Sequence, residues 1–241
     1  MDWLSVGQSV ECSINFRFVD AGNFQDLVTA GGFQSVDGKI AIVYEQICGH
    51  ADIMLHCLED GIAVAEKSVY TYFKDRLENC ILIEGSSRVG SAYPKDIAYN
   101  SARVGKCVFC NEKNTDAGIL KYYREHDYHI VDVKQGYAKC SVCKVTKRAI
   151  ITSDKGICHE AEKYGIDVLP IMERKILLPG FEYGFIGGAT GLLDEKTLAI
   201  CGNIEYLDNC DKILGFCEKY GVDVLSLCKG QPLDVGTILV I

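Results

Sequence analysis

A repeated octapeptide constrains the fold of this 241-residue chain more than any other feature. Residues 162–169 read EKYGIDVL and residues 218–225 read EKYGVDVL. In each copy a helix-favouring stretch ends at a glycine, which suits the left-handed backbone at a helix C-terminus, and a β-branched apolar run follows. Both copies therefore predict the end of an amphipathic helix, a glycine stop and a strand.

Weaker copies of this helix-to-strand order come earlier in the chain. One has a helix over Tyr70–Glu78 and a strand over Asn79–Ile83, and the next has a helix over Ala117–His126 and a strand over Tyr128–Val133. Each strand is followed by a turn and by a segment of small and polar residues that leads into another strand. These segments lie about 43 to 48 residues apart and begin near His50, Asp96, Lys139, Phe185 and Leu233. One unit is thus strand, turn, strand, helix, strand, with five openings in the chain.

The fifth opening lies so close to the C-terminus that its helix and last strand cannot follow it. The N-terminal residues offer strands at Cys12–Val19 and Ile40–Tyr44 and a short helix at Asn23–Thr29. Ring closure would give every unit two neighbours and leave no unpaired sheet edge between units. We therefore expect one α/β domain over residues 1–241, a circularly permuted five-bladed propeller whose two termini complete one blade. An open α/β sheet with helices on both faces is the alternative.

Composition and charge narrow the class of partner. Apolar residues make up 48% of the chain, enough for one substantial core, yet no apolar run is long enough to span a bilayer. The first residues lack the basic and hydrophobic regions of a signal peptide, so we expect a soluble, cytoplasmic protein without a membrane partner. A net charge of −8 without a Lys/Arg cluster disfavours nucleic acid. We expect a small-molecule ligand and allow for a homo-oligomer.

Thirteen cysteines raise the alternatives of disulfides and zinc. An odd number placed mainly in apolar runs favours reduced thiols that pack as small hydrophobes. Two CxxC pairs, Cys107–Cys110 and Cys140–Cys143, have the spacing of a zinc site. Both pairs lie in strand-like runs, where residues three apart point to opposite faces, so we expect no metal.

A glycine-rich segment over Phe185–Leu192 resembles a nucleotide loop only superficially. It lacks the lysine of a P-loop and the GxGxxG spacing. We expect its glycines to allow close packing or a bulge rather than to bind phosphate, and we expect no cofactor.

Two unit openings carry residues suited to nucleophilic chemistry. His50 begins the run HADIM, and Cys140 lies in QGYAKCS, 90 residues or about two units further on. A thiol becomes a useful nucleophile when a nearby imidazole, cation or helix N-terminus stabilises the thiolate. If His50 begins a strand, alternation places Asp52, Met54 and His56 on the same face as His50.

This arrangement resembles the pentein superfamily, which includes arginine deiminases, dimethylarginine hydrolases and amidinotransferases. In that family a His-x-Asp segment opens one repeat, and a Gly-rich segment ending in the nucleophilic cysteine opens the repeat two units later. An acidic segment opens the repeat before the His repeat, a place that Asp234 takes around a permuted ring. The pattern from about His50 to the C-terminus also resembles an uncharacterised clostridial-type group of the same fold.

The resemblance implies a cysteine-dependent hydrolase or transferase that acts on C–N bonds of a guanidine- or amidine-like small molecule. Cys140 would be the nucleophile that forms a covalent thiouronium adduct, His50 the general acid and base, and Asp52 and Asp234 the acids that orient or bind. The glutamate of the family's acidic motif is missing here, and the opening at Phe185 carries no acid.

Asp96 and Asn100, from the unit between His50 and Cys140, are the candidates to replace that acid in substrate binding. The alternative function is a catalytically silent scaffold of the same fold that binds a small ligand or a protein. Fold alone does not decide between the two.

Overall fold

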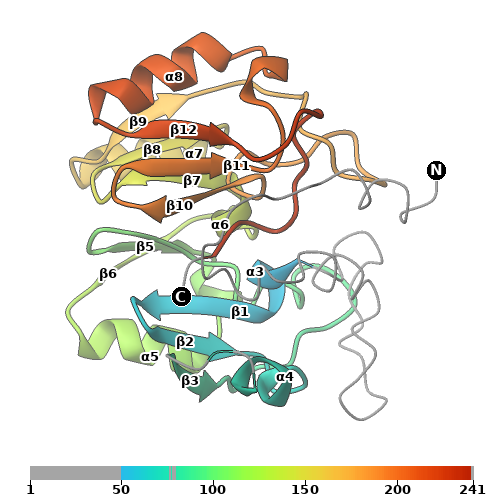
Figure 1. The fold of residues 1–241 in the computed structure, drawn as a ribbon. Coiled ribbons are helices and arrows are strands. Elements are labelled where there is room, and N and C mark those ends of the chain that lie inside the picture. Colours follow the sequence, from blue (N-terminus) through green and yellow to red (C-terminus); the bar gives the residue numbers. More distant parts are fainter. Residues whose placement is uncertain (1–49, 76, 78–79, 240–241) are drawn as a thin grey trace.

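The computed structural model describes residues 50–239 apart from 76, 78 and 79, and these residues form a mixed α/β fold built from four copies of one unit (Figure 1). Each unit holds a three-stranded sheet. Its first two strands form an antiparallel hairpin, and its third strand lies parallel to the second. A helix connects the second strand to the third, as a parallel pair requires.

The units follow one another along the chain. Unit 1 comprises β1 (Leu55–Glu59), β2 (Ile62–Ala65), α4 (Tyr70–Lys74) and β3 (Ile81–Glu84). Unit 2 comprises β4 (Ala102–Val104), β5 (Cys107–Cys110), η3 (Glu112–Asn114), α5 (Ala117–Glu125) and β6 (His129–Asp132). Unit 3 comprises β7 (Val142–Thr146), β8 (Ala149–Thr152), α7 (Lys155–Lys163) and β9 (Asp167–Pro170). Unit 4 comprises β10 (Thr190–Asp194), β11 (Thr197–Ile200), η4 (Ile204–Tyr206), α8 (Cys210–Lys219) and β12 (Asp223–Ser226).

The glycine stops of the repeat lie where the octapeptides predict them. Gly165 has φ +68° and Gly221 has φ +67°, each just after α7 or α8 and before a strand. Asp127, with φ +55°, holds the same place in unit 2, since an aspartate tolerates this conformation better than most residues. The predicted strand, strand, helix, strand order is confirmed in four units, although the helix expected over Tyr70–Glu78 already ends at Lys74.

Neighbouring units share their cores. Buried side chains of α5 belong to one apolar cluster with Val64 of unit 1, those of α7 to a cluster with Phe109 of unit 2, and those of α8 to a cluster with Ile151 of unit 3. The helix of one unit therefore packs on the sheet of the unit before it. No unit could bury its apolar faces alone, which is the behaviour of a repeat fold.

The last described residues run back from unit 4 to unit 1, seen in dark red beside α3 in Figure 1. Leu233 forms a parallel bridge with Leu177. The amide of Thr237 donates to the Gly188 carbonyl at 2.7 Å, and the carbonyl of Gly236 accepts from the Asp52 amide at 3.4 Å. This segment joins the two ends of the described chain.

The elements expected at Cys12–Val19, Asn23–Thr29 and Ile40–Tyr44 lie outside the described residues. A complete fifth blade and a closed ring therefore stay predictions.

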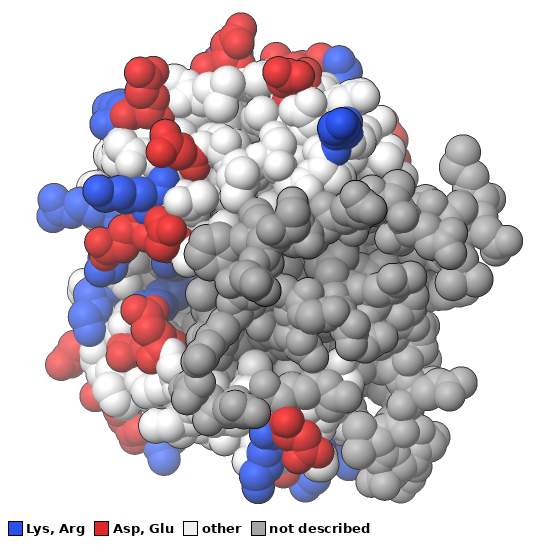
Figure 2. All heavy atoms as spheres, in the orientation of Figure 1, with Lys and Arg blue, Asp and Glu red and all other residues white. Residues whose placement is uncertain are grey.

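Charged side chains of both signs are interspersed on the face shown in Figure 2. One exposed pair, Lys147 and Glu195 at 3.5 Å, connects the hairpin turns of units 3 and 4. No helix in the described part of the chain has the length and apolar character needed to cross a membrane.

Candidate active site

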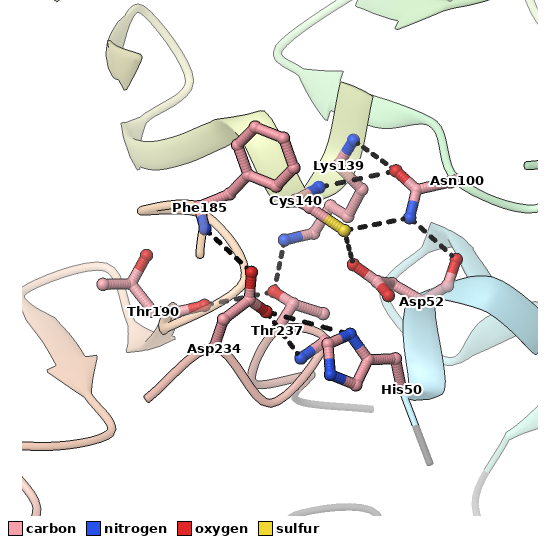
Figure 3. A network of polar contacts seen from close by, with 10 residues as sticks. His50, Asp52, Asn100, Lys139, Cys140, Phe185, Thr190, Asp234 and Thr237 are labelled. Atoms are coloured by element: carbon pink, nitrogen blue, oxygen red, sulfur yellow. Dashed lines mark hydrogen bonds and ion pairs between the residues drawn. The ribbon is translucent and has the colours of Figure 1, made fainter. Parts of the chain in front are cut away.

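Residues from separate unit openings meet in one buried cluster (Figure 3). His50 and Asp52 come from the start of α3 (Ala51–Met54), Cys140 from α6 (Ala138–Ser141), and Asp234 from the C-terminal segment. Asn100 joins them from the segment that precedes β4. All five residues are buried, and His50 is the most exposed of them at 7%.

The expectation that His50, Asp52, Met54 and His56 share one face of a strand is wrong. Residues 51–54 form a single helical turn, and the strand begins only at Leu55. The turn is fixed by the hydrogen bond from the Asp52 amide to the Gly236 carbonyl, a contact between distant segments. His56 instead lies against Tyr123, whose hydroxyl is 2.7 Å from His56 Nε2, so it belongs to the core.

The Cys140 thiol is held between a carboxylate and an amide. Its Sγ donates to Asp52 Oδ2 at 2.8 Å and accepts from Asn100 Nδ2 at 3.2 Å. Asn100 Nδ2 also donates to the Asp52 carbonyl at 3.3 Å, and its Oδ1 accepts from the Lys139 amide at 2.8 Å. Asn100 thus links α3 to α6, and its contact with substrate stays a prediction.

Asp234 forms the second acidic side of the cluster. Its Oδ2 accepts from the Phe185 amide at 2.8 Å and its Oδ1 from the Gly236 amide at 3.0 Å. His50 Nδ1 lies 3.8 Å from the same Oδ1. Of the two acids, the structure therefore places Asp234 within ion-pair distance of the imidazole.

Glycines allow these backbones to approach. A Cβ on Gly188 would collide with the carboxylate of Asp234, and one on Gly187 would lie 2.6 Å from the Cys140 carbonyl oxygen. Gly236, with φ +75°, lies directly against His50. The glycine-rich segment serves close packing, as its sequence predicts.

The electrostatics favour a neutral thiol in the free protein. Burial first, and then the charges of Asp52 and Asp234, raise the pKa of Cys140 well above its usual value. Burial also raises the pKa of Asp234, although His50 opposes this shift. Asp52 Oδ1 is buried without a hydrogen-bond partner among the described residues. A buried acidic site with a free acceptor suits a cationic ligand that donates hydrogen bonds.

Two polar residues of the cluster were not predicted from the sequence. Lys139 Nζ donates to Thr237 Oγ1, which in turn donates to the Thr190 carbonyl at 3.1 Å. Thr237 has the unusual φ of +74°. Their positions next to Cys140 and three residues after Asp234 are the only sequence signals that pointed to them.

Asp96 is buried beside the site rather than in the Cys140 cluster. Its Oδ2 accepts from the Tyr137 hydroxyl at 2.6 Å, and its Oδ1 has no partner among the described residues. The Tyr137 ring lies 6.5 Å from that of Phe185, whose amide binds Asp234. In the described part of the chain, Asp96 forms no hydrogen bond with His50, Asp52 or Cys140.

The expectation that both CxxC pairs lie in strands is confirmed for one pair only. Cys107 and Cys110 both belong to β5, whereas in the second pair Cys140 lies in α6 and Cys143 in β7. Within residues 50–239, with the three gaps named above, no group of three or more His, Cys, Asp or Glu side chains is placed to hold a metal ion. The cysteines described in this range are free thiols.

Comparisons with known proteins give one family and two similar structures. Residues 37–239 match the sequence profile of DUF6873, a family of unknown function. The structure is similar to SxtG, an amidinotransferase from Microseira wollei in the saxitoxin biosynthetic pathway, with a TM-score of 0.42 and 10% identity over 70% of this chain and 61% of that one. It is similar to agmatine deiminase from C. jejuni, with a TM-score of 0.42 and 10% identity over 69% of this chain and 62% of that one.

The chain thus spans about three fifths of the length of each of these two proteins. No sequence among the curated proteins matched it.

Proposed function

This chain belongs to the DUF6873 family of unknown function, and we propose that its buried cysteine modifies a guanidine- or amidine-like small molecule through a covalent adduct. The observation that carries the proposal is the 2.8 Å contact between the Cys140 thiol and Asp52, in a cluster that also holds Asp234 and His50. A thiol, two acids and an imidazole from separate units would not converge for packing alone.

Binding of a cation would activate this site. A guanidinium or amidinium group donates paired N–H bonds to carboxylates, and the free oxygen of Asp52 is an acceptor for them. Its positive charge would offset the two negative charges that hold the pKa of Cys140 high. Substrate binding would therefore favour the thiolate that the free protein disfavours, and the thiol proton would pass to His50, which becomes the proton donor of the next step.

The chemistry then needs one proton carrier. The thiolate of Cys140 attacks the central carbon of the substrate, and protonated His50 gives its proton to the departing nitrogen as the C–N bond breaks. A thiouronium adduct and a neutral amine result. His50 then takes a proton from water in a hydrolase, or from an acceptor amine in a transferase, as that nucleophile displaces Sγ.

We propose the pentein fold together with this activity. Four equal units and a C-terminal segment that contacts both unit 4 and unit 1 support a five-bladed ring closed by the N-terminal residues. We also propose a cytoplasmic location, because a nucleophilic thiol among many free cysteines requires a reducing compartment.

A catalytically silent scaffold is the second candidate, and the burial of the thiol favours it. Cys140 is only 4% exposed and its pKa is raised, so an inert thiol is the default state of the free protein. The two functions differ in whether a cationic ligand makes Cys140 reactive.

Alkylation with matched reagents tests the proposal. A haloacetamidine carries the amidinium charge, and a haloacetamide is its neutral analogue, so their labelling of Cys140 at pH 7 can be compared by mass spectrometry. We expect the cationic reagent to label Cys140 at least about tenfold faster, a preference that Asp234→Asn removes. The exposed Asp208→Asn should change neither rate.

Equal labelling by the two reagents, at a rate no higher than that of the half-buried Cys158, would contradict the enzyme. The silent scaffold would then be the better description.

A further inference from the structure

The first strands of the units carry a set of equivalent positions outside the cysteine site. In each unit, one residue of the first strand lies opposite the second residue of the second strand. These equivalent residues are Cys57, Arg103, Lys144 and Leu192. All four are half-buried. In β1, β4 and β7 the residues on either side are buried, so the side chains at these positions point away from the shared apolar cores.

Three cations gather around this set. Strand β4, which carries Arg103, and strand β7, which carries Lys144, lie next to each other, and Lys139 precedes β7 by three residues. Burial raises the pKa of Cys57 to about 12, while the charges of Lys139, Arg103 and Lys144 act in the opposite direction. The same three charges therefore act on one thiol, in keeping with the adjacency of β4 and β7.

These cations lack carboxylate partners of comparable burial. Lys144 Nζ forms no hydrogen bond or ion pair with the residues that the structure describes, and Lys139 Nζ contacts the hydroxyl of Thr237. Arg103 meets Asp60 at 3.3 Å, but Asp60 is fully exposed and its pairing is weak. Burial, followed by the charges of Arg103 and Lys139, lowers the pKa of Lys144 to about 8. Uncompensated cations in a half-buried place are costly unless an anion joins them.

We propose that Arg103, Lys139 and Lys144 form a binding site for a small oxyanion where β4 and β7 lie next to each other. The guanidinium of Arg103 matches two oxygens of a phosphate or carboxylate, and the two ammonium groups supply further donors. Lys139 connects this site to the Cys140 cluster through Thr237, but the site has the opposite charge preference to Asp52 and Asp234 and does not need a reactive Cys140.

Inorganic phosphate is the probe, and thermal unfolding of the full chain is the measurement. We compare phosphate with chloride at equal ionic strength and pH 7, where Lys144 is protonated. At a hundred times the Kd, a single site should raise Tm by about 5–10 °C for a chain of this size. Lys144→Met and Arg103→Met should each abolish this rise, whereas Lys147→Met, an exposed lysine on the same hairpin, should retain it.

Phosphate can also stabilise every variant non-specifically, because it is excluded from protein surfaces. A second measurement, made without phosphate, separates this effect from binding. In phosphate-free buffer Lys144→Met should have a higher Tm than the parent chain, because it removes an uncompensated charge. No phosphate response in the parent chain, or an equal response in Lys144→Met, would overturn the site.

A competition experiment distinguishes two sources of the anion, a carboxylate of the substrate and a free oxyanion. A guanidino compound with a carboxylate tail that competes with phosphate, through Lys144, would identify the tail of the substrate as the anion. Absence of competition would identify a free oxyanion. Both results support the site, and neither depends on the reactivity of Cys140.

Discussion

Asp52 is the single residue that most directly controls the state of Cys140. Its carboxylate accepts the thiol hydrogen bond, and its charge is the next cause after burial of the raised pKa of Cys140. The same charge that would attract the proposed cationic substrate therefore keeps the Cys140 thiol protonated in the free protein. This arrangement protects a buried thiol from adventitious oxidation, since the thiolate is the reactive form.

Asp52→Asn should uncouple these two effects. Loss of the negative charge lowers the pKa of Cys140, and each unit of decrease gives about tenfold more thiolate at neutral pH. We expect faster labelling of Cys140 by neutral haloacetamide and slower labelling by cationic haloacetamidine. Slower labelling by both reagents would show that the carboxylate helps to remove the thiol proton instead.

The sequence predicted the main members of the Cys140 cluster, but not how they contact one another. His50, Asp52, Cys140 and Asp234 stand at repeat openings, and the repeat brings those openings to one place. The pairing of His50 with Asp234 depends on Gly236, whose conformation follows from tertiary contacts. Pattern alone therefore gives the members of the cluster and leaves their pairing open.

Helices could be predicted where they are long enough for their apolar residues to show a helical period. Helices α5, α7 and α8 have nine or ten residues and show an apolar stripe, and their glycine or aspartate stops are local signals. The turns α3 and α6 have four residues each, too few for a period to show. Contacts with the distant residues Gly236 and Asn100 hold these turns. Because the local sequence does not reveal such contacts, it suggested strands there.

The cap of α5 also joins unit 2 to the segment that follows β3 of unit 1. Asp116 is buried, and its Oδ1 accepts from the amides of Gly118 and Ile119 at 2.8 and 3.2 Å. Its Oδ2 accepts from the amides of Ser86 and Ser87 at 2.9 and 2.6 Å. Burial alone would raise the pKa of Asp116, but the hydrogen bonds from Ser86 and Ser87 outweigh it and lower the pKa.

Asp116→Ala should therefore destabilise the fold more than the loss of an ordinary helix cap does. We expect the free energy of unfolding to fall by about 3–5 kcal/mol, because several donors lose their acceptor. Asp154→Ala at α7 is the matched control, since Asp154 accepts one helix amide, and it should cost about 1 kcal/mol. Urea unfolding at pH 7 measures both, and equal costs would contradict the special role of Asp116.

The lowered pKa of Asp116 sets the direction of its pH dependence. Its contribution is present above the pKa of an unfolded aspartate, about 3.9, and is lost as the pH falls through the lower folded value. The difference in stability between the parent chain and Asp116→Ala should therefore narrow in acid.

At the scale of the whole molecule, the C-terminal segment acts as a clasp between the ends of the described chain. Its backbone bonds to Leu177 and Gly188 on one side and to Asp52 on the other. It also places Asp234 beside His50. The proposed permuted ring would require such a clasp, because its closing blade would be assembled from both termini.

Deletion of residues 233–241 should open the molecule at this point. The loss of several backbone hydrogen bonds and of buried Ile238 should cost at least about 3 kcal/mol, or roughly 6–12 °C in Tm. Hydrogen exchange should accelerate at the amides of Asp52 and Phe185, which lose their acceptors, and stay slow in α7. Removal of residues 240–241 alone is the control and should preserve both. If the longer deletion left exchange at Asp52 unchanged, unit 1 would be held without the clasp, and the closed ring would lose its structural support.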